Sequence, residues 1–141
     1  MGDTLYSSNQ SETLVANNKK KKVFVVEDDL ILNLLYENYM EKLGFETEGE
    51  LVYGKTAVEL AKKINPDLIL MDIALEGDMD GIEAMRKIRK FSDVPVIYIT
   101  GNSDPAHRQR AEEIGYTDYL NKPLEFEDLK ASLVRANILA G

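Results

Sequence analysis

The sequence has 141 residues, of which 44% are apolar and 30% charged, and its formal net charge is −8. This length suits one globular domain, and the balance of apolar and charged residues is ordinary for such a domain. The absence of cysteine excludes disulfides, thiolate metal sites and cysteine nucleophiles, and the single histidine, His107, excludes a multi-histidine zinc site.

The first 22 residues differ from the rest in charge and pattern. They hold four lysines, at 19–22, against two acidic residues, a balance of +2, so the remaining chain holds −10. We expect residues 1–22 to form a disordered polar and basic tail with solvated lysines, and residues 23–139 to form the domain. A domain this acidic lacks the basic surface of a nucleic-acid-binding protein. No apolar run approaches the ~20 residues of a membrane span and no signal-peptide core is present, so we expect a cytoplasmic protein without a membrane partner.

Apolar patterns after residue 22 predict strands and helices in alternation. In chain order we expect a strand at 23–26, a helix at 30–43, a strand at 45–51, a helix at 56–64, a strand at 68–71, a helix at 82–90, a strand at 96–100, a helix at 105–114, a strand at 116–120 and a helix at 124–139. Asp104 and Pro105 fit the N-cap and first turn of the fourth helix.

An apolar stripe at helical spacing runs along both the first and the last of these helices. In the first helix the stripe comprises Ile31, Leu34, Leu35, Tyr39 and Leu43, and in the last helix it comprises Phe126, Leu129, Leu133 and Ala136. The strands at 23–26, 68–71 and 96–99 are continuously apolar, which is typical of strands buried on both faces. Five strands, each followed by a helix, predict a doubly wound α/β domain with a parallel sheet. Its functional crevice is expected at the carboxyl ends of the strands.

Charged and hydroxyl side chains stand at those strand ends. The first strand ends in Glu27-Asp28-Asp29, the third in Asp72 and the fourth in Thr100, and the fifth is followed by Lys122-Pro123. Carboxylates converging on one sheet edge repel one another unless a cation lies among them, and Mg²⁺ prefers such oxygen ligands together with water. A lysine opposite the metal and a threonine hydroxyl would complete a cradle for a phosphoryl group.

These motifs, in this order and followed by "DGIE" at 80–83, resemble the receiver domain of two-component response regulators, the group that includes the chemotaxis response regulator. The resemblance covers residues 23–139. It implies a flavodoxin-like sheet of five parallel strands in the order 2-1-3-4-5, covered by five helices.

The resemblance also implies a role for each matching residue. Asp72 would be the phosphoryl acceptor and a magnesium ligand, together with Asp28, the backbone carbonyl of Ala74 and, through water, Glu27. The run "EDD" allows two choices for the acidic pair, either Glu27 with Asp28 or, one residue later, Asp28 with Asp29. We prefer Glu27 and Asp28 as the acidic pair because they directly follow the apolar strand, which leaves Asp29 as a helix cap.

The same resemblance assigns the remaining site residues. Lys122 would pair with the phosphoryl oxygens, and a cis bond before Pro123 would orient that lysine. Thr100 and Tyr119 would be the switch pair, and the face formed by the helix at 105–114, the strand at 116–120 and the last helix would change most. The implied partner is a histidine kinase or phosphotransfer protein, with a homodimer through this face as a further expectation. The domain would assist its own phosphorylation and dephosphorylation without being an enzyme in the usual sense.

Other interpretations stay open at this stage. A degenerate receiver that acts only as a binding module, and an aspartyl-phosphate hydrolase, are the alternatives, although Ala74 stands where such a hydrolase has its second acid. A flavin-binding module of similar fold is disfavoured by the acidic loop after the first strand. Asp72 could merely cap a turn, and Tyr119 could merely pack in the core. We interpret His107 and the arginines at 108 and 110 as solvated surface residues.

Two features depart from the common receiver pattern. The loop that follows Asp72, "IALEGDMDGIE", is about one residue longer than usual and has Gly77 between Glu76 and Asp78 in place of a proline. Gly101 follows Thr100, where a small residue such as alanine is frequent, and is expected to leave room for the phosphoryl group.

Overall fold

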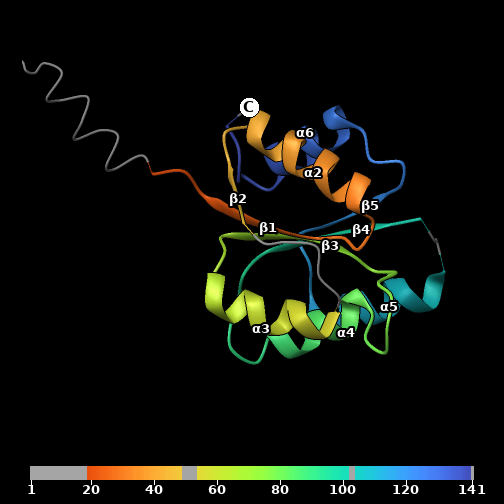
Figure 1. Ribbon diagram of the computed structural model, residues 1–141. Coiled ribbons are helices and arrows are strands. Elements are labelled where there is room, and N and C mark those ends of the chain that lie inside the picture. Colours follow the sequence, from red (N-terminus) through yellow and green to blue (C-terminus); the bar gives the residue numbers. More distant parts are fainter. Residues whose placement is uncertain (1–18, 49–53, 102–103, 141) are drawn as a thin grey trace, which may run out of the picture.

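A parallel five-stranded sheet lies between two layers of helices (Figure 1). The computed structural model describes residues 19–48, 54–101 and 104–140. The strands are β1 (Lys22–Val26), β2 (Glu46–Glu48), β3 (Leu68–Asp72), β4 (Val96–Thr100) and β5 (Asp118–Asn121). The helices are α2 (Leu30–Lys42), α3 (Gly54–Ile64), α4 (Gly81–Ile88), α5 (Pro105–Ile114) and α6 (Phe126–Arg135). The strand order is β2-β1-β3-β4-β5, which confirms the predicted topology.

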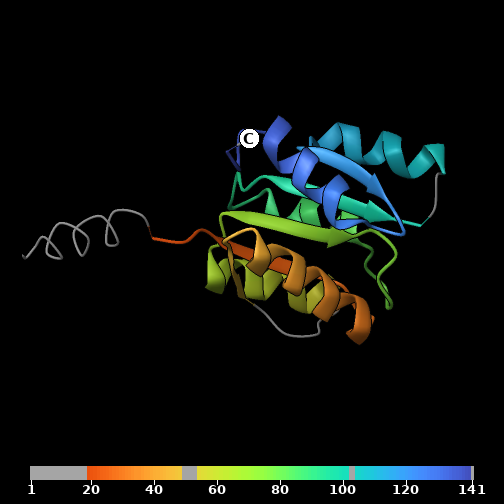
Figure 2. The same cartoon turned by 90° about the horizontal axis from the view of Figure 1, so that it is seen from above.

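The helices are divided unequally between the two faces of the sheet. Helices α3, α4 and α5 cover one face, and α2 and α6 cover the other (Figures 1 and 2). Alternate residues of β1 and β3 supply the two cores: Phe24 and Ile69 face the three-helix layer, whereas Val23 and Leu68 face the two-helix layer. Because both faces are covered, β3 and β4 are buried along their whole length, as their continuous apolar sequences predicted.

Several predicted boundaries differ from the observed ones at the edges of the sheet. Strand β2 is described only over Glu46–Glu48, and the expected continuation at 49–51 lies outside the described residues. Strand β5 begins two residues later than expected, at Asp118. Most of the predicted tail, residues 1–18, also lies outside the described part of the chain, but its last residue, Lys22, is the first residue of β1 rather than part of a tail. Within the described residues, no helix is long and apolar enough to cross a membrane.

Most of the apolar stripe predicted for the first helix faces solvent rather than the core. In α2, Ile31 is 77% exposed and Leu34 57% exposed, and Leu35 is also exposed. The buried residues of this helix are Asn33, Tyr36 and Met40, which repeat at the same helical spacing on the opposite side. Only Tyr39 and Leu43 of the predicted stripe pack against the core.

The last helix is shorter than predicted at both ends. It begins at Phe126, after Glu125 at the N-cap, and ends at Arg135 rather than near Leu139. The cause of the early ending is a left-handed residue, Asn137, with φ of 60°. The Ile138 N–H then donates to the Leu133 carbonyl, 2.9 Å away, which closes the helix.

Candidate phosphoacceptor and metal site

Four elements place their polar residues at one edge of the sheet. Asp72 is the last residue of β3, Thr100 is the last residue of β4, and Glu27 directly follows β1; all three are buried. Lys122 directly follows β5, and its backbone N–H donates to the Thr100 carbonyl at 2.8 Å. The peptide bond between Lys122 and Pro123 is cis. The parallel register thus gathers side chains that lie up to 95 positions apart in the sequence.

Three carboxylates form the centre of this site. Oxygen atoms of Glu27, Asp28 and Asp72 lie within 4.8 Å of one another. Asp29, the third acid of the "EDD" run, points elsewhere: its Oδ1 accepts from the Leu32 N–H at 3.1 Å and caps α2. The local fold therefore favours Glu27 and Asp28 over a register shifted by one residue.

Lys122 is the cation that faces the carboxylates. Its Nζ lies 3.1 Å from Glu27 Oε1 and 3.2 Å from Asp72 Oδ2. Burial lowers the pKa of Lys122, but the charges of Asp72 and Glu27 outweigh burial, so the pKa is raised. Burial and repulsion from Asp72 raise the pKa of Glu27 to about 7. One lysine does not neutralise three clustered acids, so the site favours binding of a further positive charge.

A buried amide on α2 supports the acidic pair. The Asn33 Nδ2 donates to the Glu27 carbonyl oxygen at 3.1 Å, and Asn33 is almost fully buried. This contact explains a polar residue on the inward face of α2, because a buried amide without a partner would be destabilising. The sequence analysis did not identify Asn33, since its partner is a backbone atom six residues away.

The loop after Asp72 folds over the acidic cluster. The Ala74 N–H donates to Asp72 Oδ1 at 3.1 Å, and the Glu76 N–H donates to Asp28 Oδ2 at 2.7 Å. Gly77 has φ of 100°, a left-handed conformation that glycine adopts without strain. The left-handed glycine therefore directly follows the residue whose N–H is directed at the Asp28 carboxylate.

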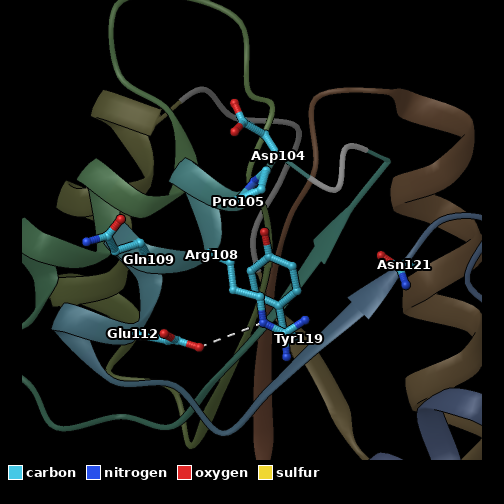
Figure 3. Close-up of a pocket in the computed structure, with 7 residues that line it drawn as sticks. All are labelled: Asp104, Pro105, Arg108, Gln109, Glu112, Tyr119 and Asn121. Atoms are coloured by element: carbon cyan, nitrogen blue, oxygen red, sulfur yellow. Dashed lines mark ion pairs between the residues drawn. The ribbon is translucent and has the colours of Figure 1, made fainter.

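Tyr119 lies behind the site in an aromatic cluster. It is buried, and its ring centroid is 6.1 Å from that of Tyr98 and 5.6 Å from that of Tyr116. Its strand neighbour in the β4–β5 register is Tyr98, two residues before Thr100. The guanidinium of Arg108 lies over the Tyr119 ring, 4.8 Å from its centroid. Arg108 and Tyr119 line a pocket of about 350 Å³ between α5 and β5. Figure 3 shows the side chains that line this pocket.

Of the three residues of α5 predicted to be solvated, Arg108 is exposed, as predicted, whereas His107 and Arg110 are only partly exposed. Arg108 contacts Tyr119, and Arg110 forms a two-contact ion pair with Asp80. His107 is only partly exposed, and its Nδ1 is buried without a hydrogen-bond partner in the described part of the chain. These contacts join residues more than ten positions apart, so helical periodicity gave no signal for them.

The donor set suits a hard divalent cation. Carboxylate oxygens gathered around one point are the ligands that Mg²⁺ prefers, and Asp28 is partly open to solvent and leaves room for water. The repulsion that raises the pKa of Glu27 would be relieved by such an ion. The residues present therefore fit a bound magnesium.

Residues 23–134 match the family described as the response regulator receiver domain. Among curated proteins, the transcriptional regulatory protein CrdR of Helicobacter pylori is 32% identical over 122 residues, covering 82% of this chain and 54% of that protein. The transcriptional regulatory protein PdtaR of Mycobacterium tuberculosis is 32% identical over 109 residues, covering 77% and 53%. The chain spans about half the length of the curated relatives it matches.

Solved structures of similar fold include two receiver domains and a chemotaxis protein. The signal receiver domain of a modulated diguanylate cyclase from Desulfovibrio desulfuricans G20 is 31% identical with a TM-score of 0.77, covering 84% of this chain and 94% of that one. The receiver domain of a sensor histidine kinase from Pseudomonas aeruginosa PAO1, solved with a magnesium ion in its active site cleft, is 32% identical with a TM-score of 0.71, covering 82% and 96%. Vibrio cholerae CheY4 is 26% identical with a TM-score of 0.74, covering 83% and 98%.

Proposed function

Because the chain belongs to the response regulator receiver domain family, we propose that it is a phosphorylation switch in which Asp72 accepts a phosphoryl group from a phosphohistidine. The observation that carries this proposal is the buried Asp72 at the end of β3, paired with Lys122 and grouped with Glu27 and Asp28. A buried, ionised carboxylate is costly, and a role as nucleophile accounts for its position.

We propose that Mg²⁺ binds through Asp28, Asp72 and the carbonyl of Ala74, with Glu27 acting through water. When bound, the ion would offset negative charge on the transferred group. The solved receiver domain from Pseudomonas aeruginosa, with magnesium in its cleft, supports this assignment by similarity.

In the proposed transfer, an Asp72 carboxylate oxygen attacks phosphorus in line with the bond to the histidine nitrogen. The new O–P bond forms as the N–P bond breaks, and the electron pair of that bond stays on the imidazole, leaving an acyl phosphate on Asp72. Lys122, already 3.2 Å from Asp72 Oδ2, would move with the incoming phosphoryl oxygens and stabilise their charge. Hydrolysis by water would later restore the carboxylate.

The output is proposed to be a change of conformation at the α5–β5–α6 face. The hydroxyl of Thr100, at the end of β4, would donate a hydrogen bond to the new phosphoryl group, and Tyr119 would repack behind Thr100. The stacking of Arg108 on Tyr119 places a charged residue of α5 directly on the proposed switch. A homodimer through this face is one way in which the change could be read.

We propose that the phosphohistidine partner docks on α2. Its exposed apolar residues, Leu30, Ile31, Leu34 and Leu35, begin two positions after Asp28 and so lie beside the acidic site. This exposed apolar face of α2 lies next to the proposed phosphoacceptor. It could pack against the apolar face of a partner helix that carries the phosphohistidine.

Intact mass after incubation with acetyl phosphate tests the proposed function. With Mg²⁺ present, we expect the wild type to gain one phosphoryl group and Asp72→Asn to gain none. Omitting Mg²⁺ should abolish the gain in the wild type. No gain despite demonstrated Mg²⁺ binding would favour a degenerate receiver that only binds a partner, and a gain that persists in Asp72→Asn would mean that another carboxylate is the acceptor.

A further inference from the structure

Arg110 on α5 is joined to Asp80 in the loop between β3 and α4. The Arg110 Nη1 donates to Asp80 Oδ2 at 2.9 Å, and Nη2 donates to Asp80 Oδ1 at 3.2 Å. The two side chains are 35% and 28% exposed, so this pair is shielded from solvent more than a surface ion pair. A guanidinium with two parallel contacts fixes both the distance and the orientation of its partner.

Asp80 connects this pair to the proposed phosphoacceptor. Its Oδ1 also accepts from the Glu83 N–H at 2.8 Å and caps α4. The next residue, Gly81, donates its N–H to the Ile73 carbonyl at 2.9 Å. A Cβ at Gly81 would overlap the backbone carbonyl oxygen of Asp72. The backbone beside Asp80 is therefore packed directly on that of Asp72.

The other end of the pair lies on the proposed switch face. Arg110 stands two positions after Arg108, whose guanidinium covers the ring of Tyr119. Through these two arginines α5 contacts both the loop that follows β3 and the aromatic residue of β5. A shift of α5 relative to the loop would break both hydrogen bonds of Arg110.

We propose that Arg110 and Asp80 are a positioning pair that couples the state of Asp72 to the position of α5. The inference rests on the proposed function and deepens it by naming residues through which the switch acts. Phosphorylation would displace the loop at Asp72, and the pair would carry that displacement to α5; equally, a partner that moves α5 would alter the geometry at Asp72.

Substitutions that remove the pair but leave its surroundings intact test this proposal. Arg110→Gln removes the charged fork, and Asp80→Asn removes the ion pair while keeping an oxygen that can cap α4. Arg110→Lys keeps the charge without the two-contact geometry. The matched control is Arg86→Gln, which breaks an exposed pair with Glu83 on α4, where the two side chains are 44% and 38% exposed.

The measurement is amide hydrogen exchange in α5, with and without beryllofluoride and Mg²⁺ as a stable phosphoryl analogue; fluorine NMR reports occupancy of Asp72. We expect the analogue to change α5 protection in the wild type and in Arg86→Gln. Arg110→Gln and Asp80→Asn should each lose more than about half of that change at equal occupancy, and the double variant should lose no more than either single variant. Arg110→Lys should recover part of the change.

Two results would overturn the inference while leaving the proposed function in place. One is a wild type that binds the analogue while α5 protection stays the same, and the other is a full α5 response in both Arg110→Gln and Asp80→Asn. A wild type that binds no analogue and gains no phosphoryl group from acetyl phosphate would refute the proposed function, and the inference with it.

Discussion

Helices α2 and α4 begin in the same way, but α4 buries its aliphatic stripe in the core whereas α2 exposes its aliphatic stripe to solvent. Each follows a central strand, each begins at the site edge, and each is capped by an aspartate: Asp29 accepts from the Leu32 N–H, and Asp80 accepts from the Glu83 N–H. Helix α4 then buries its apolar residues Ile82, Met85 and Ile88. Helix α2 buries Asn33, Tyr36 and Met40 and leaves four aliphatic side chains in solvent.

The difference shows that apolar spacing identifies a helix more securely than it identifies the inward face. In α4 the apolar stripe and the buried face coincide, so the helix is explained by packing alone. In α2 two stripes compete, and the buried one combines the core residues Tyr36 and Met40 with Asn33, whose amide donates to the Glu27 carbonyl. The outward aliphatic stripe of α2 is thus left in solvent, as the proposed docking of a partner on this helix requires.

The largest expected effect is a difference in stability between a variant in the buried stripe of α4 and a variant in the exposed stripe of α2. Ile88→Ala should lower the free energy of unfolding by about 2–5 kcal/mol, because it opens a cavity under α4. Ile31→Ala should change it by less than about 0.5 kcal/mol, because Ile31 is exposed. Urea denaturation measures both.

Ile31→Ala also tests whether the exposed stripe of α2 serves phosphoryl transfer rather than stability. Ile31→Ala should slow phosphoryl transfer from a phosphorylated histidine phosphotransfer domain that phosphorylates the wild type, and leave labelling by acetyl phosphate unchanged. A loss of stability for Ile31→Ala similar to that for Ile88→Ala would contradict the assignment of the α2 stripe to the surface.

A smaller effect is expected where the two helices begin. Gly81→Ala places a methyl group against the Asp72 carbonyl oxygen and should destabilise the domain by about 1–3 kcal/mol, with a lower rate of phosphorylation by acetyl phosphate. The matched variant at the start of α2 is Leu30→Ala, which alters an exposed side chain and should have little effect on either property. Equal phosphorylation rates in Gly81→Ala and wild type would argue that the Asp72 backbone tolerates displacement.

Glu27, before α2, and Asp80, before α4, should make stability depend on pH in opposite directions. Because the pKa of Glu27 is raised from 4.5 to about 7, the native state keeps a proton that the unfolded chain loses, and stability should fall as pH rises between those values. Burial raises the pKa of Asp80, but contacts from Arg110 and the Glu83 N–H outweigh burial and lower it, so its contribution should be lost as pH falls below 3.8.

Urea denaturation at several pH values measures both slopes. Glu27→Gln should flatten the upper slope, which is the fall in stability between pH 4.5 and about 7. Asp80→Asn should reduce the lower slope, which is the loss of stability below pH 3.8. Adding Mg²⁺ should also flatten the upper slope, since a bound cation favours the charged form of Glu27. An unchanged upper slope in Glu27→Gln would assign that dependence to another group.

The strand ends could be predicted from sequence because topology alone brings them together. Glu27 and Asp72 each follow a continuous apolar run, Lys122 follows a strand-like segment, and a parallel sheet has one carboxyl edge. The face of α2 and the pairing of Arg110 could not be predicted, because both depend on contacts between residues that no local pattern links. The end of α6 was missed because it depends on a single left-handed asparagine, Asn137.

The tyrosines around β5 have a consequence for optical measurements. The chain has seven tyrosines and no tryptophan, so no indole emission overlies that of the phenol rings. Tyr98, Tyr116 and Tyr119 have ring centroids 5.6 to 6.1 Å apart, close enough for excitation energy to pass among them. If Tyr119 leaves its two neighbours and the covering guanidinium of Arg108, the polarisation and yield of tyrosine emission will change. The unlabelled protein therefore carries its own fluorescent reporter of the α5–β5 surface.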